Sequence, residues 1–440
     1  MADANLKLDD FDFIRFCWSD THGISRARMI PRRNVAKFMQ SGVGVFQGIL
    51  ALGADSGLYI DLPHNNGWPN SYAMPDLKTL RPIPWVNDGV HRVGQMLCDL
   101  TLPNTGGMPM PNCPRSMAKK QVERLRTMGL ELYSSFETEM TLFDLATGKP
   151  KVPDAGFTTT FQMSKEENLL MEIDDLLKAA SVDVESYQIE YGASQFEMPL
   201  APCFGIEPAD MMFVFRNGLK EICHKRGVDA TFMTKPCPSN ICNGGHYNHS
   251  LWTAGDRKSA FASADDSDGL SQIFRQWLGG LIKHAPALCA IYCPTVNCYR
   301  RLNQPWAPNK ADWGIDNRLP SFRVKVGSSP FIENRIPSAA CNPYLAIAAT
   351  IAAGIDGIQT GSTCPPAMDP SAQKFPRTLQ EALEFLQEDK VMTDALGEPF
   401  MQWYVPMKQE LEIKRLPNTD VSFDDAEAIA AEVTVYGNCI

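Results

Sequence analysis

The sequence contains no run of apolar residues long enough to suggest a membrane span, and it has no excess of positive charge. Its most apolar stretch, residues 338–355, is short for a transmembrane helix and contains Asn342-Pro343, so it favours a buried helix. Lysine and arginine together number 41 against 51 aspartates and glutamates, which gives a formal net charge of −10. This acidic balance argues against nonspecific binding to nucleic acid or to a membrane surface, but not against a local cationic pocket.

Cysteine pairs and glycine-rich nucleotide motifs are also missing. The thirteen cysteines occur singly, no Cys-x-x-Cys pair is present, and no histidine has the spacing for a zinc site. We interpret them as reduced core cysteines, and residues 1–10 show no signal-peptide pattern, so we expect a cytoplasmic protein. Neither a P-loop nor a Gly-x-Gly-x-x-Gly motif occurs, and we find no internal repeat.

Length and composition are those of an ordinary globular chain. With 440 residues, 44% of them hydrophobic, it can form roughly three domains, or one large and one small domain. The segment 102–114 holds four prolines and two glycines, which predicts a linker and a boundary near residue 110, dividing the chain into 1–110 and 111–440. Hydrophobic patterning predicts strands over 11–17, 25–30 and 90–98, and helices over 116–128, 165–180, 208–226, 269–289, 343–355, 378–387 and 400–413.

Two pairs of carboxylates lie in segments that otherwise resemble core strands. Glu137 and Glu139 fall on one face of a predicted strand, where they either face solvent or bind a divalent cation. Glu190 and Glu197 are seven residues apart, so on a straight strand they would point in opposite directions. A bulge or bend at Gly192 and Ser194 would bring them together; otherwise they are two unrelated surface acids.

A histidine and several arginines follow the carboxylates along the chain. His246 and Asn248 share one strand face after a glycine pair, although a lone histidine is more often structural. Arginines in apolar strands suit bidentate binding of carboxylate or phosphate, and internal salt bridges are the alternative. They occur at positions 300, 301, 318, 323 and 335. Together these residues indicate an anionic substrate above a metal pocket.

The order of these segments resembles the glutamine synthetase superfamily from about Phe11 to the C-terminus. The markers are Met74-Pro75-Asp76, Glu137-x-Glu139, Glu190 with Gln195-Phe196-Glu197, the glycine-rich stretch ending in His246, Pro294-Thr295-Val296-Asn297-x-Tyr299-Arg300-Arg301-Leu302, Trp313-Gly314-Ile315-Asp316-Asn317-Arg318, and Glu333-Asn334-Arg335 before Asn342-Pro343-Tyr344-Leu345. The resemblance implies an α+β fold with a small N-terminal β-grasp domain and a catalytic domain whose curved antiparallel sheet forms a half-barrel. It also implies a homo-oligomer, commonly a dodecamer of two stacked hexamers, with active sites between subunits.

The resemblance also implies roles for individual residues. Two or three Mg²⁺ or Mn²⁺ ions per site are expected, one held by Glu139, Glu190 and Glu197 and another by Glu137, His246 and Glu333. Arg301 and Arg335 would bind the carboxylates of glutamate, with Gly244 allowing close approach. Arg318 would act with Glu333 in catalysis by stabilising the transferred phosphoryl group, and Ser250, Asn248 and Arg323 would contact ATP.

Four positions depart from the family pattern. Gln47 replaces an aspartate and Trp306 lies near a missing glutamate; in glutamine synthetases these two acids bind ammonium. An anion-free site with an aromatic surface favours an organic amine as the acceptor. Asn248 replaces a second histidine and Phe331 an arginine, both of which usually touch ATP phosphates, so ATP would need other contacts such as Lys325.

These features predict an ATP-dependent ligase that joins the γ-carboxylate of glutamate to an organic amine through a γ-glutamyl phosphate. One alternative is a metal-dependent enzyme on the same fold that no longer uses ATP, because of Asn248 and Phe331. Another is a noncatalytic structural homologue, against which the complete set of metal ligands argues. The sequence does not specify which amine or which metal is used.

Overall fold

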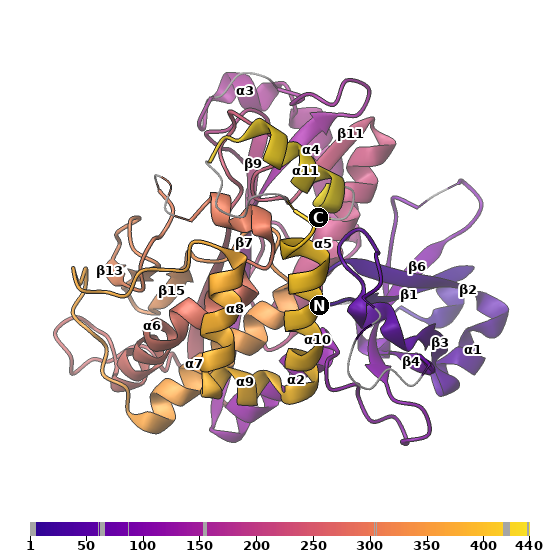
Figure 1. Ribbon diagram of the computed structural model, residues 1–440. Helices are drawn as coiled ribbons and strands as arrows, with labels where there is room; N and C mark the ends of the chain where they lie inside the picture. The colour runs from indigo at the N-terminus through magenta and orange to yellow at the C-terminus, as the bar shows by residue number, and fades with distance from the viewer. Residues whose placement is uncertain are drawn as a thin grey trace.

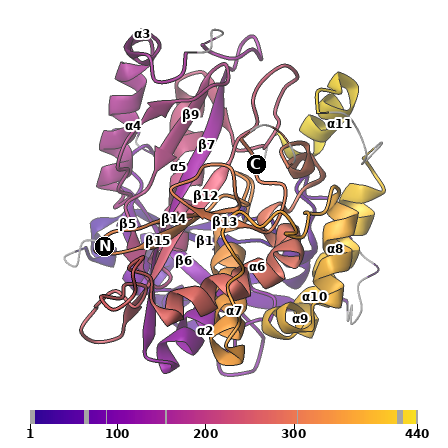
Figure 2. The same ribbon diagram turned by 90° about the vertical axis from the view of Figure 1, so that its left-hand side faces the viewer.

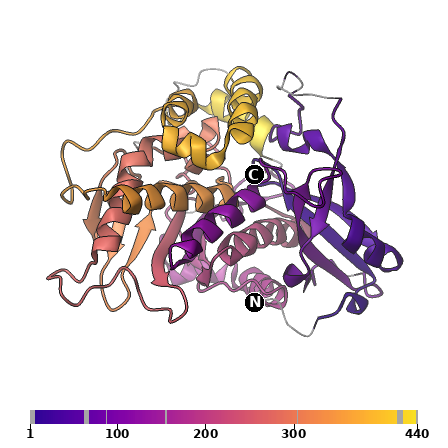
Figure 3. The ribbon, with the colours of Figure 1, turned by 90° about the horizontal axis from the view of Figure 1, so that it is seen from below.

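The computed structural model describes residues 6–59, 61, 67–86, 88–152, 156–302, 304, 306–416, 423–437 and 440. These residues form two β-sheets with helices packed around them, which confirms the predicted α+β class. Figure 1 shows the N-terminal sheet in indigo at the right and the second sheet with most of the helices at the left, and Figure 3 shows the same separation from below.

The N-terminal sheet has six strands in the order β2-β1-β6-β4-β3, with β5 paired to β6. Strands β1 and β6 run parallel, and the other pairs are antiparallel. The three strands predicted in this region are present. The bounds are β1 Phe13–Ser19, β2 Ser25–Pro31, β3 Val43–Phe46, β4 Asn70–Pro75, β5 Arg81–Pro82 and β6 Val93–Thr101, with helices η1 Leu8–Asp10, α1 Arg32–Ser41, η2 Gln47–Ala51 and η3 Leu77–Thr79.

Strand β1 of the N-terminal sheet is buried on both faces. Ile14, Phe16 and Trp18 alternate along β1 into a small N-terminal core, whereas Cys17 on the opposite face joins the large core of the molecule. Across this contact, Glu221 of helix α5 accepts hydrogen bonds from Arg15 Nη1 at 2.7 Å and from Trp85 Nε1 at 2.9 Å. The two sheets are therefore joined by both apolar packing and a charged anchor.

The second sheet has nine strands and centres on one long strand, β7. Its order is β13-β14-β15-β12-β7-β9-β8, and β10 and β11 also pair with β7. All pairs are antiparallel except β13 with β14. The bounds are β7 Leu130–Asp144, β8 Gln188–Ile189, β9 Gln195–Pro199, β10 Cys203–Phe204, β11 Val228–Thr231, β12 Gly245–Thr253, β13 Trp313–Ile315, β14 Phe322–Lys325 and β15 Phe331–Asn334.

Helices cover the second sheet, as the view in Figure 2 shows. All seven predicted helices are present, although the one expected over 269–289 runs on to residue 292 and the one over 400–413 is split by a π-helical turn. The bounds are α2 Pro114–Thr127, α3 Thr160–Ser164, α4 Glu167–Ala179, α5 Glu207–Lys225, α6 Gln272–Tyr292, η4 Val296–Arg300, α7 Pro343–Thr360, α8 Leu379–Glu388, α9 Lys390–Leu396, α10 Glu398–Lys408, η5 (the π-helical turn) Gln409–Ile413 and α11 Ala426–Tyr436.

Helix α7, the most apolar segment of the chain, is buried against α6. The Asn342 side chain accepts a hydrogen bond from the Tyr344 amide at 3.0 Å and caps the helix, and Gly361 ends it in a left-handed conformation. A Cβ atom on Gly357 would lie 2.1 Å from the Gln276 carbonyl oxygen, so only glycine allows the two helices to come this close. Within the part of the chain described, no helix has the length and apolar character needed to cross a membrane.

The proline-rich segment 102–114 is packed rather than free at its far end. Pro109 forms a bridge with Thr101, and Met110 and Cys113 are buried in the N-terminal core. Pro114 then begins α2, where its missing N–H group is tolerated. Among the described residues every cysteine is free, and most are buried, as the sequence predicts.

Candidate active site

Strand β12 lies between β7 and β15 and brings one histidine between two carboxylates. In the register of the sheet His246 is opposite Glu137, and Asn248 is opposite Glu333. The His246 Nδ1 atom lies 3.3 Å from Glu137 Oε1 and 3.5 Å from Glu333 Oε1. One ligand atom from each of the three residues lies within 4.8 Å of the others, which is a separation that one metal ion can bridge.

The other face of β12 is structural. His249 points into the core, where its Nε2 atom accepts a hydrogen bond from Trp277 Nε1 at 3.0 Å. Burial lowers the pKa of His249 to about 4, so this histidine is neutral at pH 7. The predicted placing of His246 and Asn248 on one face of β12 is therefore confirmed, and His249 lies on the other face.

Three further carboxylates lie beside this group. Glu139 and Glu197 are opposite each other across β7 and β9, and Glu190 follows the short strand β8. The bulge or bend expected at Gly192 and Ser194 is the turn of a β8–β9 hairpin, where the Gln195 amide donates to the Gly192 carbonyl at 3.1 Å. A hairpin reverses the chain, which explains how acids seven residues apart reach the same side of the sheet.

The carboxylates raise and lower one another's pKa values. Burial and then the charges of Glu137, Glu139 and Glu190 raise the pKa of Glu197 to about 10. Burial and then Glu139 also raise the pKa of Glu190. Although burial opposes it, the hydrogen bond and charge of His246 hold the pKa of Glu137 down to about 2. Such repulsion between buried acids is relieved by a cation, and the donor set of oxygens with one imidazole fits Mg²⁺ or Mn²⁺.

Arg301 lies on the side of His246 away from Glu137. Its Nη2 atom is 2.9 Å from the Arg335 carbonyl oxygen, to which it donates, and 3.4 Å from His246 Nε2. A Cβ atom on Gly244 would lie 3.1 Å from Arg301 Nη2 and 3.3 Å from His246 Nε2. The absence of a side chain at Gly244 therefore leaves the space in which the guanidinium and the imidazole meet.

Two arginines flank Glu333. Arg323 Nη1 donates to Glu333 Oε2 at 2.9 Å, and Arg335 Nε lies 3.2 Å from Glu333 Oε1. Burial lowers the pKa of Arg335, and so do the charges of Arg301, Arg323 and Arg318, while Glu333 opposes them. Arg318 itself is exposed, and it affects the pKa of Arg335 through its charge.

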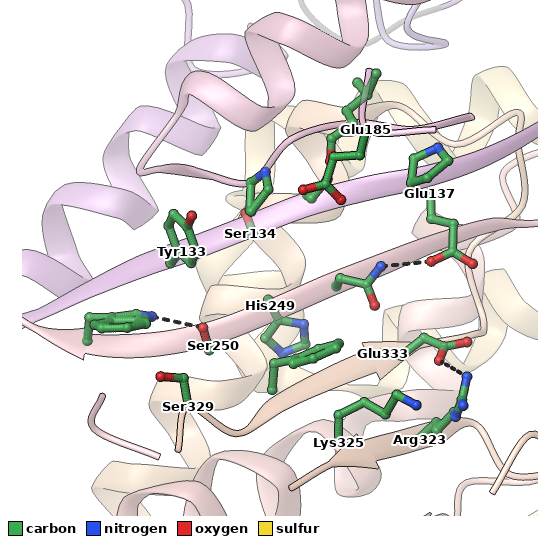
Figure 4. A pocket seen from close by; sticks show the side chains of 17 residues that line it. Tyr133, Ser134, Glu137, Glu185, His249, Ser250, Arg323, Lys325, Ser329 and Glu333 are labelled. Atoms are coloured by element: carbon green, nitrogen blue, oxygen red, sulfur yellow. Dashed lines mark hydrogen bonds and ion pairs between the residues drawn. The ribbon is translucent and has the colours of Figure 1, made fainter. Parts of the chain in front are cut away.

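A cavity of about 440 Å³ opens beside the acids (Figure 4). Asn248, Ser250, Arg323 and Glu333 line it, and Asn248 Nδ2 donates to Glu137 Oε2 at 3.1 Å. Phe331 and Lys325 also line it, and Lys325 Nζ lies 2.6 Å from Asp316 Oδ1. The walls are otherwise largely apolar, formed by Tyr133, Pro199, Leu200, Pro202 and Trp252. The cavity thus combines a polar end at the acids with an apolar end.

The two positions expected to contact the acceptor lie in different parts of the molecule. Trp306 is 65% exposed and is held at the rim, because Arg335 Nη2 donates to its carbonyl oxygen at 3.0 Å. Asn303 and Pro305 of the same loop lie outside the described residues. Gln47 begins η2, directly after β3 of the N-terminal sheet, and is not brought to the carboxylates of its own chain.

Sequence reasoning missed two amides that organise the acids. Gln195 Nε2 donates to Glu139 Oε2 at 3.0 Å and also lies 3.0 Å from Asn243 Oδ1. The Gly244 amide donates to the same Glu139 oxygen at 2.7 Å. Gln195 stands in the quoted Gln195-Phe196-Glu197 motif, and its pairing with Glu139 could have been inferred from the shared sheet face. Glu185, which also lines the cavity, has no such sequence signal.

Comparison with known proteins is consistent with this geometry. The family model described as the catalytic domain of glutamine synthetase matches residues 111–425. Lengsin of Homo sapiens is 31% identical over 427 residues, which are 91% of this chain and 80% of Lengsin. Glutamate–isopropylamine ligase of a Pseudomonas species is 28% identical over 365 residues, which are 78% of each chain. A solved complex of GmaS with ADP is 28% identical with a TM-score of 0.81, covering 91% of this chain and 93% of GmaS.

Proposed function

Because this chain belongs to the glutamine synthetase family, and is a carbon–nitrogen ligase, we propose that it joins the γ-carboxylate of glutamate to an organic amine. ATP would first convert the γ-carboxylate into γ-glutamyl phosphate, and the amine would then displace phosphate. The observation that carries the choice of amine is Trp306, whose aromatic side chain is exposed and whose backbone carbonyl accepts a hydrogen bond from Arg335. The described residues of that loop carry no acid to bind ammonium.

The bound substrates would meet groups of opposite charge. Arg301 and Arg335 present guanidinium groups suited to the carboxylates of glutamate, and both are buried, so their hydrogen bonds with an anion are strong. Arg318, exposed at the rim, is free of the packing that fixes Arg335 and could follow the charge of the transferred phosphoryl group.

Metal ions would be held by two groups of residues. We assign Glu139, Glu190 and Glu197 to one ion and Glu137, His246 and Glu333 to the other. When bound, the ions would screen the charge of the phosphates and of the γ-carboxylate. Arg323 pairs with Glu333 in this structure. When a metal ion binds Glu333 instead, we expect the Arg323 side chain to turn toward a phosphate.

Nucleotide binding would use the cavity beside the acids. Asn248 lies at its polar end, Ser250 lines it beside Trp252, whose Nε1 atom donates to Ser250 Oγ at 2.9 Å, and Lys325 supplies a cation where Phe331 cannot. The ADP complex of GmaS supports a nucleotide in a protein of this shape. A homo-oligomer, such as a dodecamer of two hexameric rings, would allow Gln47 of a neighbouring copy to reach the acceptor side of this site.

The test is an ADP-release assay with glutamate, Mg²⁺ or Mn²⁺ and a panel of amines that includes ammonium. We expect turnover that requires glutamate and an amine together, with an alkyl or aromatic amine preferred over ammonium. Replacing Trp306→Glu should shift the preference toward ammonium, whereas Phe161→Glu, at another exposed aromatic residue, should not. Ammonium preference in the wild type, or no turnover with any amine, would refute the proposal.

A second candidate function is supported by Asn248 and Phe331 at the cavity. A metal-dependent enzyme that does not use ATP would bind Mn²⁺ tightly and show no ATP binding by calorimetry. Micromolar affinity for ATP in the presence of metal would exclude this candidate.

A further inference from the structure

Helix α11 lies beyond the matched family region and carries a buried glutamate that is hydrogen-bonded to the turn before Arg301. The family match ends at residue 425, and α11 begins at Ala426. Glu432 on this helix is 1% exposed. Its two carboxylate oxygens accept hydrogen bonds from Arg300 Nε and Nη2, both at 2.8 Å, and one also accepts from Asn297 Nδ2 at 2.7 Å. Three charge-assisted bonds on one buried carboxylate make a strong and directional anchor.

The anchor holds the turn that leads directly into Arg301. Arg300 is the last residue of η4, and Asn297 is its second residue. Arg301 follows, and its guanidinium is held on the far side by the carbonyl oxygens of Ile336 and Arg335 at 3.1 and 2.9 Å. The backbone of Arg301 is thus fixed through Arg300 and its side chain through the loop after β15. The position of the Arg301 guanidinium beside His246 therefore depends on both sets of hydrogen bonds.

The same anchor reaches a second loop of the site. Asn297 Oδ1 accepts from the Lys235 amide at 2.7 Å, and Asn297 Nδ2 donates to the Lys235 carbonyl at 2.9 Å. The neighbouring Thr234 carbonyl accepts from the Asn243 amide at 2.7 Å, and Gly244 comes next. Through Asn297, Glu432 therefore supports the loop that carries Gly244 as well as the turn that carries Arg301.

We propose that Glu432 is a positioning residue that, through Arg300 and Asn297, sets the Arg301 guanidinium for binding the carboxylate of the glutamate substrate. The inference rests on the proposed role of Arg301 in binding glutamate. It assigns to α11, drawn in yellow at the upper right of Figure 2, a function in substrate affinity. Glu432 touches no substrate, so its loss should change glutamate binding more than the affinity for ATP, which would lie at the other side of the acids.

The experiment compares Glu432→Gln with a matched control, Glu412→Gln. Glu412 is also 1% exposed and also holds α11, because Tyr436 Oη donates to it at 2.6 Å. It reaches η4 only through that hydroxyl, which accepts from the Val296 amide at 3.4 Å, and it makes no hydrogen bond to Arg300 or Asn297. Both variants remove one buried carboxylate from the C-terminal part of the chain, Glu412 from η5 and Glu432 from α11. A third variant, Glu432→Asp, keeps the charge and shortens the side chain. Each is assayed for KM of glutamate, KM of ATP and kcat, and the position of Arg301 is determined in crystals.

We expect Glu432→Gln to raise KM for glutamate at least tenfold and KM for ATP less than twofold, with Arg301 displaced from His246. Glu432→Asp should be intermediate, and it serves as the test if the Gln variant does not fold. Glu412→Gln should lower the melting temperature and leave KM for glutamate within twofold. Equal effects of Glu432→Gln and Glu412→Gln, or an unmoved Arg301, would overturn the inference. If the wild type shows no turnover, the proposed function fails, and the crystal comparison alone decides the positioning role.

Discussion

Glu197 should destabilise the metal-free protein, and Glu197→Gln should therefore raise its stability. Burial and three neighbouring carboxylates raise the pKa of Glu197 to about 10, from an ordinary value of 4.5. A carboxyl group with a raised folded-state pKa contributes its stability fully below the unfolded-state pKa and loses it as the pH rises toward the folded-state pKa. In the absence of metal, stability should therefore fall between pH 4.5 and about 10 because of this group.

At pH 7 the destabilisation caused by Glu197 is set by how far pH 7 lies above its unfolded-state pKa. The exact folded-state pKa does not matter as long as it lies above pH 7. About 2.5 pH units at about 1.4 kcal/mol each amount to roughly 3.4 kcal/mol. Glutamine removes this penalty and keeps an N–H donor for Glu137, whose hydrogen bond with Glu197 helps to hold its pKa down. With about 2.1 cal/mol/K of unfolding entropy per residue, the gain corresponds to a rise of about 3–4 °C in melting temperature.

In divalent metal the wild type should become more stable than the Glu197→Gln variant, the reverse of the order expected without metal. A ligand at 100 times its Kd stabilises the folded state by about 2.7 kcal/mol, and the glutamine variant should need at least tenfold more Mn²⁺ for the same shift. Melting temperatures are measured from pH 5 to pH 8 in chelator and in a Mn²⁺ titration. The control is Glu185→Gln, which also lines the cavity with a raised pKa but belongs to neither proposed metal group. A variant less stable than wild type in chelator at pH 7, or a difference independent of pH, would refute the reasoning.

Three further predictions address the substrate, the nucleotide and the core. Gly244→Ala places a Cβ atom 3.1 Å from Arg301 Nη2 and should raise KM for glutamate about tenfold in steady-state kinetics, equivalent to about 1.4 kcal/mol; an unchanged KM would contradict the proposed glutamate site. Phe331→Arg adds a cation to the cavity and should strengthen ATP binding about tenfold by calorimetry, equivalent to about 1.4 kcal/mol, with Phe331→Gln as the uncharged control. His249 has a folded-state pKa of about 4, below its ordinary 6.5, so the stability it contributes is complete above pH 6.5 and is lost toward pH 4. Urea unfolding should show a slope of up to about 1.4 kcal/mol per pH unit in that window, and His249→Gln should reduce it.

Strand periodicity accounts for most of what could be predicted of the site. Glu137 with Glu139, and His246 with Asn248, share faces because alternate side chains on a strand point the same way, and that rule needs no tertiary information. The hairpin at Gly192–Ser194 was harder, since Gly and Ser at those positions suit a bulge as well as a turn. Only pairing between β8 and β9 distinguishes the two.

Long-range contacts account for most of what could not be predicted. Glu432 and Arg300 are 132 residues apart, and a buried acid on a short helix has no local signal that names its partner. The helix α1 was missed because most of its ten residues are polar and only Val35 is buried, so little apolar surface marks it in the sequence. The proposed approach of Gln47 to the acceptor side would involve a neighbouring copy of the chain, about which one chain's sequence pattern carries no geometric information.

The proposed metal ligands lie on or directly beside paired strands, whereas Trp306 and Gln47 lie on connecting segments. A strand position is constrained by its neighbours on both sides, but a loop can change length or residue type with little effect on the sheet. Trp306 has a φ of +67°, a conformation in which glycine or asparagine would be less strained, so the loop that presents it is open to replacement. The proposed acceptor preference of this scaffold could thus be exchanged, in evolution or by engineering, while the proposed chemistry of carboxylate activation is left in place.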